Sequence, residues 1–279
     1  MKTALLQITS SDQPHQNLET VLAMVEEAAG KGAQFILTPE VTNCVSLSRA
    51  HQDDVLSTED EDSFLTAMRV AAARLGVWLL LGSLALKTDD PDGRFANRSF
   101  LIAPDGTIRA WYDKIHMFDV DISAKETFRE SEGYRPGDRA VVAETDFGRV
   151  GMTICYDLRF PHLHRQLAQA GARILTVPAA FSPVSGAAHW HTLLRARAIE
   201  TGCFVLATAQ CGTHPRSDAG KLRETYGHSL VVSPWGDILA DGGTEPGIVM
   251  VDLKLTEVDN TRKRIPSISA DQPFKGPDV

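Results

Sequence analysis

The chain lacks the cysteine, leader and membrane patterns that assign many proteins to a class. Its four cysteines, Cys44, Cys155, Cys203 and Cys211, include no Cys-x-x-Cys pair, and four cysteines in 279 residues do not predict a disulfide framework. No apolar run approaches the ~18 residues of a transmembrane helix. The N-terminus carries no signal-peptide pattern. These absences predict a cytoplasmic protein in a reducing compartment, with no membrane partner.

Long runs of lysine or arginine are absent as well. The sequence has 28 Lys and Arg residues against 36 Asp and Glu residues, which gives a formal net charge of -8. A chain of this charge without a basic run is not expected to bind nucleic acid or an anionic membrane surface. The hydrophobic fraction of 43% is ordinary for a soluble globular protein.

Two familiar hydrolase motifs are also missing. There is no Gly-x-Ser-x-Gly sequence, which argues against a serine hydrolase, and no His-Glu-x-x-His sequence. Two His-x-His pairs are present, His162 with His164 and His189 with His191. Both fall in predicted helices, where residues i and i+2 point apart, so we expect no metal, with a metal-dependent hydrolase as the alternative. His228 is interpreted as structural or as a residue at the edge of a pocket.

What the sequence does contain is an alternation of helix and strand patterns along its whole length. Apolar residues recur at helical spacing over 18–29 and 64–75. Further helices are expected over 161–170 and 189–201, and the charged segment 254–264 is a candidate for the last helix. Buried-strand patterns occur at 3–8, 35–38, 77–84, 173–177, 203–209, 229–232, 237–240 and 248–251. Two hairpins are predicted, 97–103 with 107–112 and 140–145 with 149–154. Because no linker divides the chain, we expect one α/β domain over residues 1–266 with mixed sheets, and a C-terminal arm or tail over 267–279.

Three ionisable residues each follow a predicted strand. Glu40 follows the strand at 35–38, Lys114 follows the strand at 107–112, and Cys155 follows the strand at 149–154. Taken singly, the glutamate is as often a cap, the lysine is usually a surface residue, and the cysteine is usually an inert core residue. Ligand sites in α/β sheets gather at the carboxyl ends of strands. Together the three residues therefore predict a site with a base, a cation and a nucleophile.

The surroundings of Cys155 favour a reactive thiol. The apolar run that precedes it reads as a buried strand that delivers the thiol to the start of a helix. A helix N-terminus carries partial positive charge and free N–H groups, which favour the thiolate. Cys44, Cys203 and Cys211 are interpreted as structural, although Cys44 is close to Glu40 in the sequence and is a candidate to line a pocket.

The segments around these three residues resemble a known family. They are Pro39-Glu40, Tyr112-Asp113-Lys114-Ile115-His116 and Ile154-Cys155-Tyr156-Asp157-Leu158-Arg159-Phe160-Pro161. Their order and flanks are similar to those of the nitrilase superfamily of carbon–nitrogen hydrolases, from residue 1 to about residue 266. The resemblance implies a four-layer α-β-β-α sandwich with two mixed sheets, which pairs into a homodimer or a higher homo-oligomer.

The resemblance also implies a role for each site residue. It makes Cys155 the nucleophile, Glu40 the general base and Lys114 the oxyanion stabiliser and proton donor. Glu130 occupies the place of a supporting glutamate, and the backbone N–H of Tyr156 completes the oxyanion hole. No metal or organic cofactor is implied. Glu126 and Glu132 are acidic neighbours of Glu130 that compete for the supporting role.

Within the superfamily, the pattern is most similar to the branch that hydrolyses deaminated glutathione to 2-oxoglutarate and Cys-Gly through a cysteine thioester. Omega-amidases, which act on 2-oxoglutaramate and succinamate, are the neighbouring alternative, and an inactive binding protein of the same fold is another. Because these substrates carry carboxylates, a cationic pocket residue is expected. Arg159 is interpreted as a structural ion-pair residue, so the candidates are Arg216, Lys221 and Arg223 in the polar loop 213–223.

Overall fold

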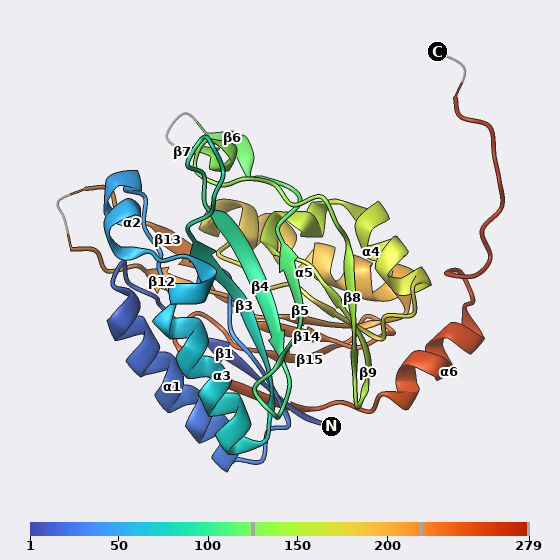
Figure 1. Cartoon of the computed structure of the whole chain (residues 1–279). Helices are drawn as coiled ribbons and strands as arrows, with labels where there is room; N and C mark the ends of the chain where they lie inside the picture. The colour runs from blue at the N-terminus through green and yellow to red at the C-terminus, as the bar shows by residue number, and fades with distance from the viewer. Residues whose placement is uncertain (124–125, 218–219, 278–279) are drawn as a thin grey trace.

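Two six-stranded mixed sheets form the centre of the computed structural model, which describes residues 1–123, 126–217 and 220–277 (Figure 1). The first sheet has the order β16 (Gly247–Asp252), β1 (Lys2–Gln7), β2 (Phe35–Leu37), β3 (Trp78–Leu86), β4 (Ala96–Ile102) and β5 (Ile108–Asp113). The second has the order β15 (Ile238–Asp241), β14 (Leu230–Val232), β11 (Phe204–Ala207), β10 (Ile174–Thr176), β9 (Gly148–Met152) and β8 (Val141–Thr145). In each sheet three parallel central strands are flanked by antiparallel neighbours.

The alternation of side chains along the strands divides the core into two parts. Leu5 of β1 belongs to the core that the first sheet shares with the second, whereas its neighbours Ala4 and Leu6 belong to a separate core on the other face. That outer core is completed by the helices α1 (Pro14–Gly30) and α3 (Ser63–Leu75). The first sheet therefore buries both of its faces.

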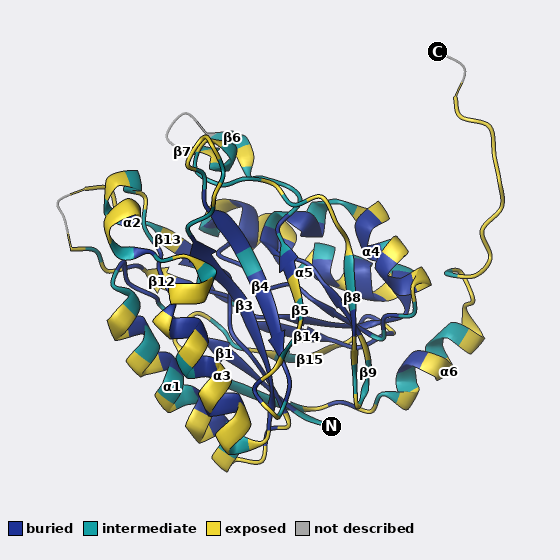
Figure 2. Cartoon of the chain, viewed as in Figure 1, coloured by how far each residue is buried: buried dark blue, intermediate teal, exposed yellow. Residues whose placement is uncertain are grey.

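Two further helices cover the second sheet. They are α4 (Pro161–Gln169) and α5 (Pro183–Thr201), and their buried residues Leu163, Leu167, Trp190, Leu194 and Ala198 pack into the core with its strands. The burial pattern in Figure 2 shows the sheets enclosed and the outer faces of the helices exposed. The layers therefore run α-β-β-α, as expected from the family resemblance.

Local signals explain why most predicted elements are found near their expected bounds. The helix α3, for example, begins after Asp62, whose carboxylate accepts a 2.7 Å hydrogen bond from the Leu65 N–H. It ends at Gly76, which adopts a left-handed conformation with φ of 65° that a side chain would disfavour.

The elements that the sequence did not reveal are short or begin in unfavourable sequence. They are α2 (Arg49–Val55), β6 (Asp119–Ser123), β7 (Glu126–Arg129), β12 (Cys211–Thr213), β13 (Glu224–Tyr226) and the 3₁₀ turns Glu59–Glu61, Glu130–Glu132 and Cys155–Arg159. The helix α5 begins at Pro183 rather than at residue 189. Its first turns contain Gly186, where a Cβ atom would lie 2.4 Å from the Tyr226 ring, so packing fixes this glycine despite its low helix propensity.

The C-terminal part follows the helix α6 (Thr256–Arg264). Residues 266–277 contain no helix or strand, and the end of this segment runs away from the layered body in Figure 1. Asp271 is paired with Arg165 and Gln169 of α4, whereas Phe274 is 91% exposed. Among the described residues, no helix is long and apolar enough to cross a membrane.

Candidate active site

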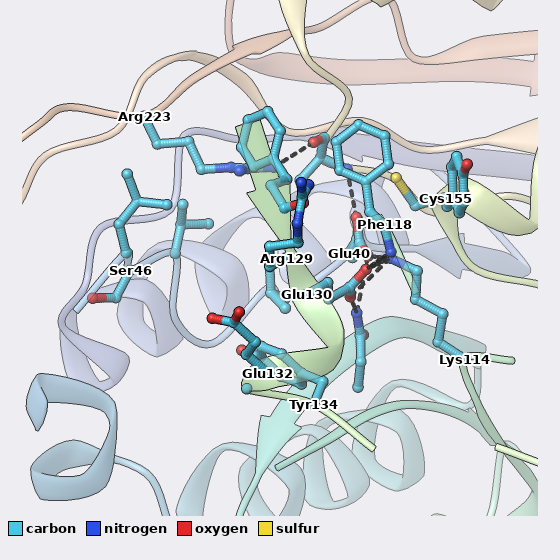
Figure 3. Close-up of a pocket in the computed structure, with 18 of the residues that line it drawn as sticks. Glu40, Ser46, Lys114, Phe118, Arg129, Glu130, Glu132, Tyr134, Cys155 and Arg223 are labelled. Atoms are coloured by element: carbon cyan, nitrogen blue, oxygen red, sulfur yellow. Dashed lines mark hydrogen bonds and ion pairs between the residues drawn. The ribbon is translucent and has the colours of Figure 1, made fainter. Parts of the chain in front are cut away.

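The three strand-end residues meet at one cavity of about 470 Å³ (Figure 3). Glu40 comes after β2 and Lys114 comes directly after β5. Cys155 comes after β9, with two residues between the strand and the cysteine. Because β2 and β5 belong to the first sheet and β9 to the second, the cavity lies where the strand ends of the two sheets come together. The structure thus places Glu40, Lys114 and Cys155 side by side, as the sequence predicted.

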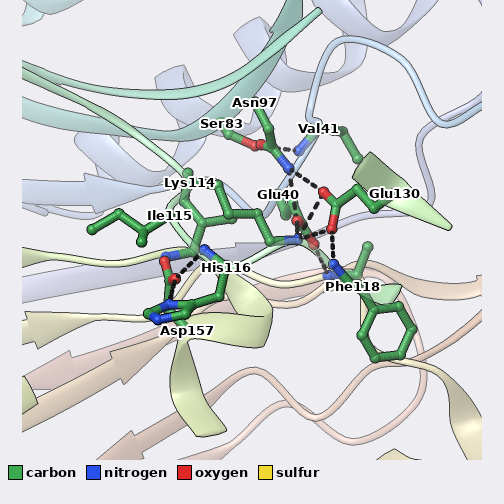
Figure 4. Close-up of polar contacts among 12 residues, drawn as sticks. Glu40, Val41, Ser83, Asn97, Lys114, Ile115, His116, Phe118, Glu130 and Asp157 are labelled. Carbon is green, nitrogen blue, oxygen red and sulfur yellow. Dashed lines mark hydrogen bonds and ion pairs between the residues drawn. The ribbon is translucent and has the colours of Figure 1, made fainter. Parts of the chain in front are cut away.

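Lys114 is held between two carboxylates (Figure 4). Its Nζ lies 2.9 Å from Glu40 Oε1 and 2.8 Å from Glu130 Oε2, and the lysine is only 2% exposed. Asn97 on β4 donates from Nδ2 to both carboxylates, at 2.9 Å to Glu40 and 3.3 Å to Glu130. Burial lowers the pKa of the ammonium, but the charges of Glu130 and Glu40 outweigh burial and raise its pKa well above 10.5.

Glu40 is ionised in this setting. Burial raises the pKa of its carboxyl, but the charge of Lys114 and hydrogen bonds from Lys114, Cys155 and Asn97 outweigh burial and lower the pKa below 4.5. Its second oxygen, Oε2, accepts a 2.8 Å hydrogen bond from the Ala180 N–H. Both oxygens of the carboxylate are therefore fixed, and one of them also receives the thiol hydrogen bond.

The environment of Cys155 favours the protonated thiol. Burial and then the negative charge of Glu40 raise the pKa of the thiol well above 9.0, and the opposing charge of Lys114 does not compensate. The helix α4 begins at Pro161, as predicted, and Cys155 itself opens a single 3₁₀ turn that precedes it. The thiol is therefore protonated at neutral pH, so the start of the helical turn does not by itself produce a thiolate. The thiol can instead be activated by the Glu40 carboxylate, to which it is hydrogen-bonded and which can accept its proton.

The backbone at the site is strained. Cys155 has a φ of 48° and Val41, next to Glu40, has a φ of 46°, both in the left-handed region that β-branched and bulky residues avoid. The Cys155 N–H donates to Pro178 O at 2.8 Å. The next N–H, that of Tyr156, donates to no protein acceptor within the described part of the chain. This turn therefore presents a free backbone donor beside the sulfur.

A glycine allows the two sheets to approach each other here. A Cβ atom on Gly82 of β3 would lie 2.0 Å from Thr38 O, 2.4 Å from Pro39 O and 2.6 Å from Pro178 Cβ. Those neighbours precede Glu40 on one side and Ala180 on the other. Any larger residue at position 82 would separate the segments that carry the two groups.

Asp157 connects the segment of Lys114 to the turn of Cys155. Its fully buried carboxylate accepts hydrogen bonds from the Tyr112 hydroxyl at 2.7 Å and the Ile154 N–H at 2.8 Å. It also lies 3.1 Å from the His116 N–H and 2.7 Å from His116 Nδ1. Figure 4 shows this carboxylate below the chain that carries Lys114.

Sequence reasoning missed Asn97, Asp157 and Ala180 as site residues. Asp157 was available within the Cys155 segment as a buried carboxylate next to the thiol. Asn97 lies inside an ordinary strand pattern, and Ala180 contributes only its backbone, so neither gave a signal.

The structure distinguishes the three acidic residues around position 130. Glu130, in the turn Glu130–Glu132, is the one that contacts Lys114, and its Oε2 also accepts a 2.7 Å hydrogen bond from the Phe118 N–H. Glu132 lines the cavity. The side chain of Glu126 lies outside the described residues. Cys44 lines the cavity as expected, and burial raises the pKa of its thiol to about 12, so it is protonated.

The His-x-His pairs separate rather than converge. His189 Nδ1 lies 3.2 Å from the guanidinium of Arg159, whereas His191 Nε2 lies 2.9 Å from Asp241 Oδ2. With His228, the last two residues form a group whose possible ligand atoms all lie within 4.8 Å of one another. None of these residues is among the described residues that line the cavity. His228 is thus part of a polar cluster away from the cavity rather than at its edge.

The second His-x-His pair also lies away from the cavity. His164 is buried with Nδ1 3.2 Å from Phe160 O, and burial lowers its pKa to about 4. The ring of His162 lies edge-on to His116 and Phe160. Of the described residues that line the cavity, none is a member of this pair.

Arg159 is not the ion-pair residue that the sequence suggested. In the described part of the chain its guanidinium contacts His189 and lies 5.5 Å from the Phe181 ring, with no carboxylate partner. Of the three candidate cations in the polar loop 213–223, one lines the cavity. Arg223 lines the cavity, whereas Arg216 and Lys221 are not among its described lining residues.

Comparison with known proteins gives one consistent family. A family model described as carbon-nitrogen hydrolase matches residues 2–263. A deaminated glutathione amidase from Yersinia enterocolitica is 39% identical over 271 residues, which cover 94% of this chain and 90% of that relative.

Solved structures show the same similarity in three dimensions. The NitFhit protein of C. elegans superposes with a TM-score of 0.89 at 34% identity, over 97% of this chain and 65% of that chain. Saccharomyces cerevisiae Nit3, a member of branch 10 of the nitrilase superfamily, superposes with a TM-score of 0.81 at 27% identity, over 95% of this chain and 94% of that chain. These matches confirm the predicted sandwich fold.

Proposed function

Because this chain belongs to the carbon–nitrogen hydrolase family, we propose that it hydrolyses a linear amide with Cys155 as nucleophile, Glu40 as general base and Lys114 as oxyanion stabiliser. The observation that carries the proposal is the contact of a protonated thiol with an ionised carboxylate beside a buried ammonium. A thiol in this state cannot attack until its proton is removed, and Glu40 is placed to accept it.

The first half of the reaction forms a thioester. Cys155 Sγ attacks the amide carbonyl carbon while its proton passes to Glu40. The negative charge that develops on the carbonyl oxygen is stabilised by Lys114 and by the free N–H of Tyr156. When the tetrahedral intermediate collapses, the carbon–nitrogen bond breaks and Glu40 returns the proton to the leaving nitrogen. An amine departs, and the acyl group stays on sulfur.

The second half restores the enzyme. A water molecule gives a proton to Glu40 and attacks the thioester carbon, again with Lys114 and the Tyr156 N–H on the oxygen. The carbon–sulfur bond breaks, the acid leaves, and the proton on Glu40 returns to Cys155. Glu130 supports this cycle because it holds Lys114 together with Glu40. The cycle calls for no metal or organic cofactor.

We propose deaminated glutathione as the substrate, with 2-oxoglutarate and Cys-Gly as products. The support is the name of the Yersinia enterocolitica relative, which matches at 39% identity over nearly the full length of both chains. An omega-amidase that releases ammonia from 2-oxoglutaramate uses the same chemistry and is the competing assignment. No observation favours the metal-dependent or the inactive alternative.

We also propose that the enzyme works as a homodimer in the cytoplasm. Ile199 of α5 and Trp235, Ile238 and Leu239 on and beside β15 are each between 42% and 52% exposed. The two elements adjoin, since Arg195 of α5 donates to Gly236 O at 2.8 Å. A second copy that covers these apolar side chains would remove them from water. The four cysteines are free and buried, which suits a reducing compartment.

The test is a comparison of kcat/KM for deaminated glutathione, 2-oxoglutaramate, a simple uncharged amide and a nitrile. The proposal predicts the highest value for deaminated glutathione and none above background for Cys155→Ala. A higher value for 2-oxoglutaramate would reassign the enzyme as an omega-amidase. Turnover that persists in Cys155→Ala would contradict the mechanism.

A further inference from the structure

We propose that Arg223 binds a carboxylate of the amide substrate and thereby selects carboxylate-bearing amides over uncharged ones. The proposal deepens the proposed function and rests on it, because it assigns the residue that recognises the substrate in the same cavity. The shared chemistry is a carboxylate, which deaminated glutathione carries at its 2-oxo acid end and at its glycine end.

Arg223 is the end of the loop between β12 and β13, and its side chain reaches the cavity (Figure 3). Nη2 donates a 2.8 Å hydrogen bond to Ala180 O, and the guanidinium lies 5.3 Å from the centre of the Phe128 ring. Within the described residues its other N–H groups have no acceptor, and it forms no ion pair with a carboxylate. A guanidinium has five N–H donors, so most of them are available to a ligand.

The other two arginines that line the cavity are already engaged. Arg129 donates from Nη2 to both oxygens of Asp121, at 2.8 Å and 3.0 Å. Arg49 donates to the carbonyls of Gly133 and Gly93 and lies over the Phe95 ring. A substrate carboxylate that bound Arg129 or Arg49 would have to displace these contacts. A carboxylate that bound the remaining N–H groups of Arg223 would displace none.

The anchor of Arg223 relates it to the reacting groups. Ala180 accepts from Arg223 through its carbonyl and donates to Glu40 Oε2 through its N–H at 2.8 Å. Two hydrogen bonds and the backbone of one residue thus separate the guanidinium from the base, as the two dashed lines in Figure 3 show. This separation suits an amide whose carboxylate is a few bonds from the scissile carbonyl. The hydrogen bond from Nη2 to Ala180 O fixes the plane of the guanidinium, and the remaining N–H groups can bind such a carboxylate.

The same anchor defines the rival interpretation. If Arg223 served only to hold Ala180, and through it Glu40, its loss would disturb the base and impair every amide alike. Binding of a carboxylate makes a different prediction, because it matters only for substrates that carry that carboxylate. The two interpretations therefore predict different results. Carboxylate binding predicts a loss that depends on the substrate and falls on KM, whereas a positioning role predicts an equal loss for every amide that falls on kcat.

The experiment measures kcat and KM of wild type, Arg223→Gln and Arg223→Lys for deaminated glutathione and for its two monomethyl esters, one blocked at the 2-oxo acid end and one at the glycine end. The matched control is Arg216→Gln, which removes a cation of the same loop that is outside the described cavity lining. A hydrogen-bonded charge pair is worth enough to predict a roughly 10- to 100-fold fall in kcat/KM for Arg223→Gln on the parent substrate. The fall should come mainly from KM, with Arg223→Lys intermediate and Arg216→Gln near wild type.

The esters identify the carboxylate. Blocking the carboxylate that Arg223 binds should cost wild type a similar factor, and Arg223→Gln should add no further loss on that ester. The other ester should behave like the parent compound. A loss that is equal for all three compounds and falls on kcat would overturn the proposal in favour of a positioning role, and unchanged constants in Arg223→Gln would overturn it outright.

If the proposed function is wrong, the experiment gives a different result. If wild type hydrolyses none of the three compounds, the substrate assignment is wrong, and Arg223 is then tested by calorimetric binding of glutarate. Binding to wild type that is lost in Arg223→Gln supports the carboxylate site, and equal binding or none to both contradicts it.

Discussion

The Asp157 carboxylate accepts a 2.7 Å hydrogen bond from the Tyr112 hydroxyl, and this contact joins the two segments that carry Lys114 and Cys155. The same carboxylate accepts from the Ile154 N–H, which directly precedes the cysteine. The relative position of the ammonium and the sulfur, which follow strands of different sheets, thus depends on the buried Asp157 side chain.

Asp157→Asn should therefore impair both folding and turnover. The amide cannot accept all of the hydrogen bonds that the carboxylate accepts, and each buried donor left unpaired costs about 1–3 kcal/mol. We expect the free energy of unfolding in urea to fall by about 2–4 kcal/mol and kcat to fall by at least roughly tenfold. Tyr112→Phe removes a single bond and should show a smaller effect of the same kind. Wild-type kcat and stability in Asp157→Asn would contradict this role.

Glu40→Gln tests the base and the state of the thiol together. Loss of a positioned base should lower kcat by about 10²–10⁴-fold. Burial raises the pKa of the Cys155 thiol first and the charge of Glu40 raises it further, so removal of that charge should lower this pKa. The rate of iodoacetamide alkylation at Cys155, followed against pH, should thus shift to lower pH in the variant. An unchanged or higher thiol pKa would be inconsistent with the electrostatic account.

Lys114→Met leaves the buried Glu40 and the partly buried Glu130 without their shared cation. Breaking a buried ion pair by removal of one partner costs about 3–5 kcal/mol, and turnover should be lost with the oxyanion stabiliser. In wild type the lowered pKa of Glu40 contributes stability above pH 4.5, which is lost as the pH falls through the folded-state value. Without the ammonium the pKa of Glu40 should be raised by burial, so the sign reverses. Relative to that of wild type, the melting temperature of the variant should rise as the pH is lowered from 8 toward about 5, whereas a profile parallel to that of wild type would refute the prediction.

His164 should make the fold sensitive to mild acid. Burial lowers its pKa from 6.5 to about 4, so the unfolded chain binds a proton in a pH range where the folded protein does not. The stability that neutral His164 contributes is complete above pH 6.5 and is lost as the pH falls toward 4. A shift of this size corresponds to about 3 kcal/mol. Urea unfolding at several pH values should show a shallower loss in His164→Leu than in wild type, and identical slopes would count against it.

The sequence predicted which residues follow the strands, but it did not predict the hydrogen-bond partners of those residues. Glu40, Lys114 and Cys155 were found from apolar runs that stop at an ionisable residue, and the structure brings all three to one cavity. The contact between Glu40 and the Ala180 N–H joins residues 140 positions apart, and it uses a backbone group that every residue has. Such a partner has no sequence signature. The state of the thiol could not be read from its flanks either, because it depends on burial and on a carboxylate from the other sheet.

The most direct test of the account is to quench the enzyme during turnover of deaminated glutathione and to measure the intact mass of the protein, followed by peptide mapping. The account predicts a 2-oxoglutaryl group attached to Cys155, absent from Cys155→Ala and slower to form in Glu40→Gln. Steady hydrolysis with no acyl group on Cys155, or an acyl group on another residue, would contradict it.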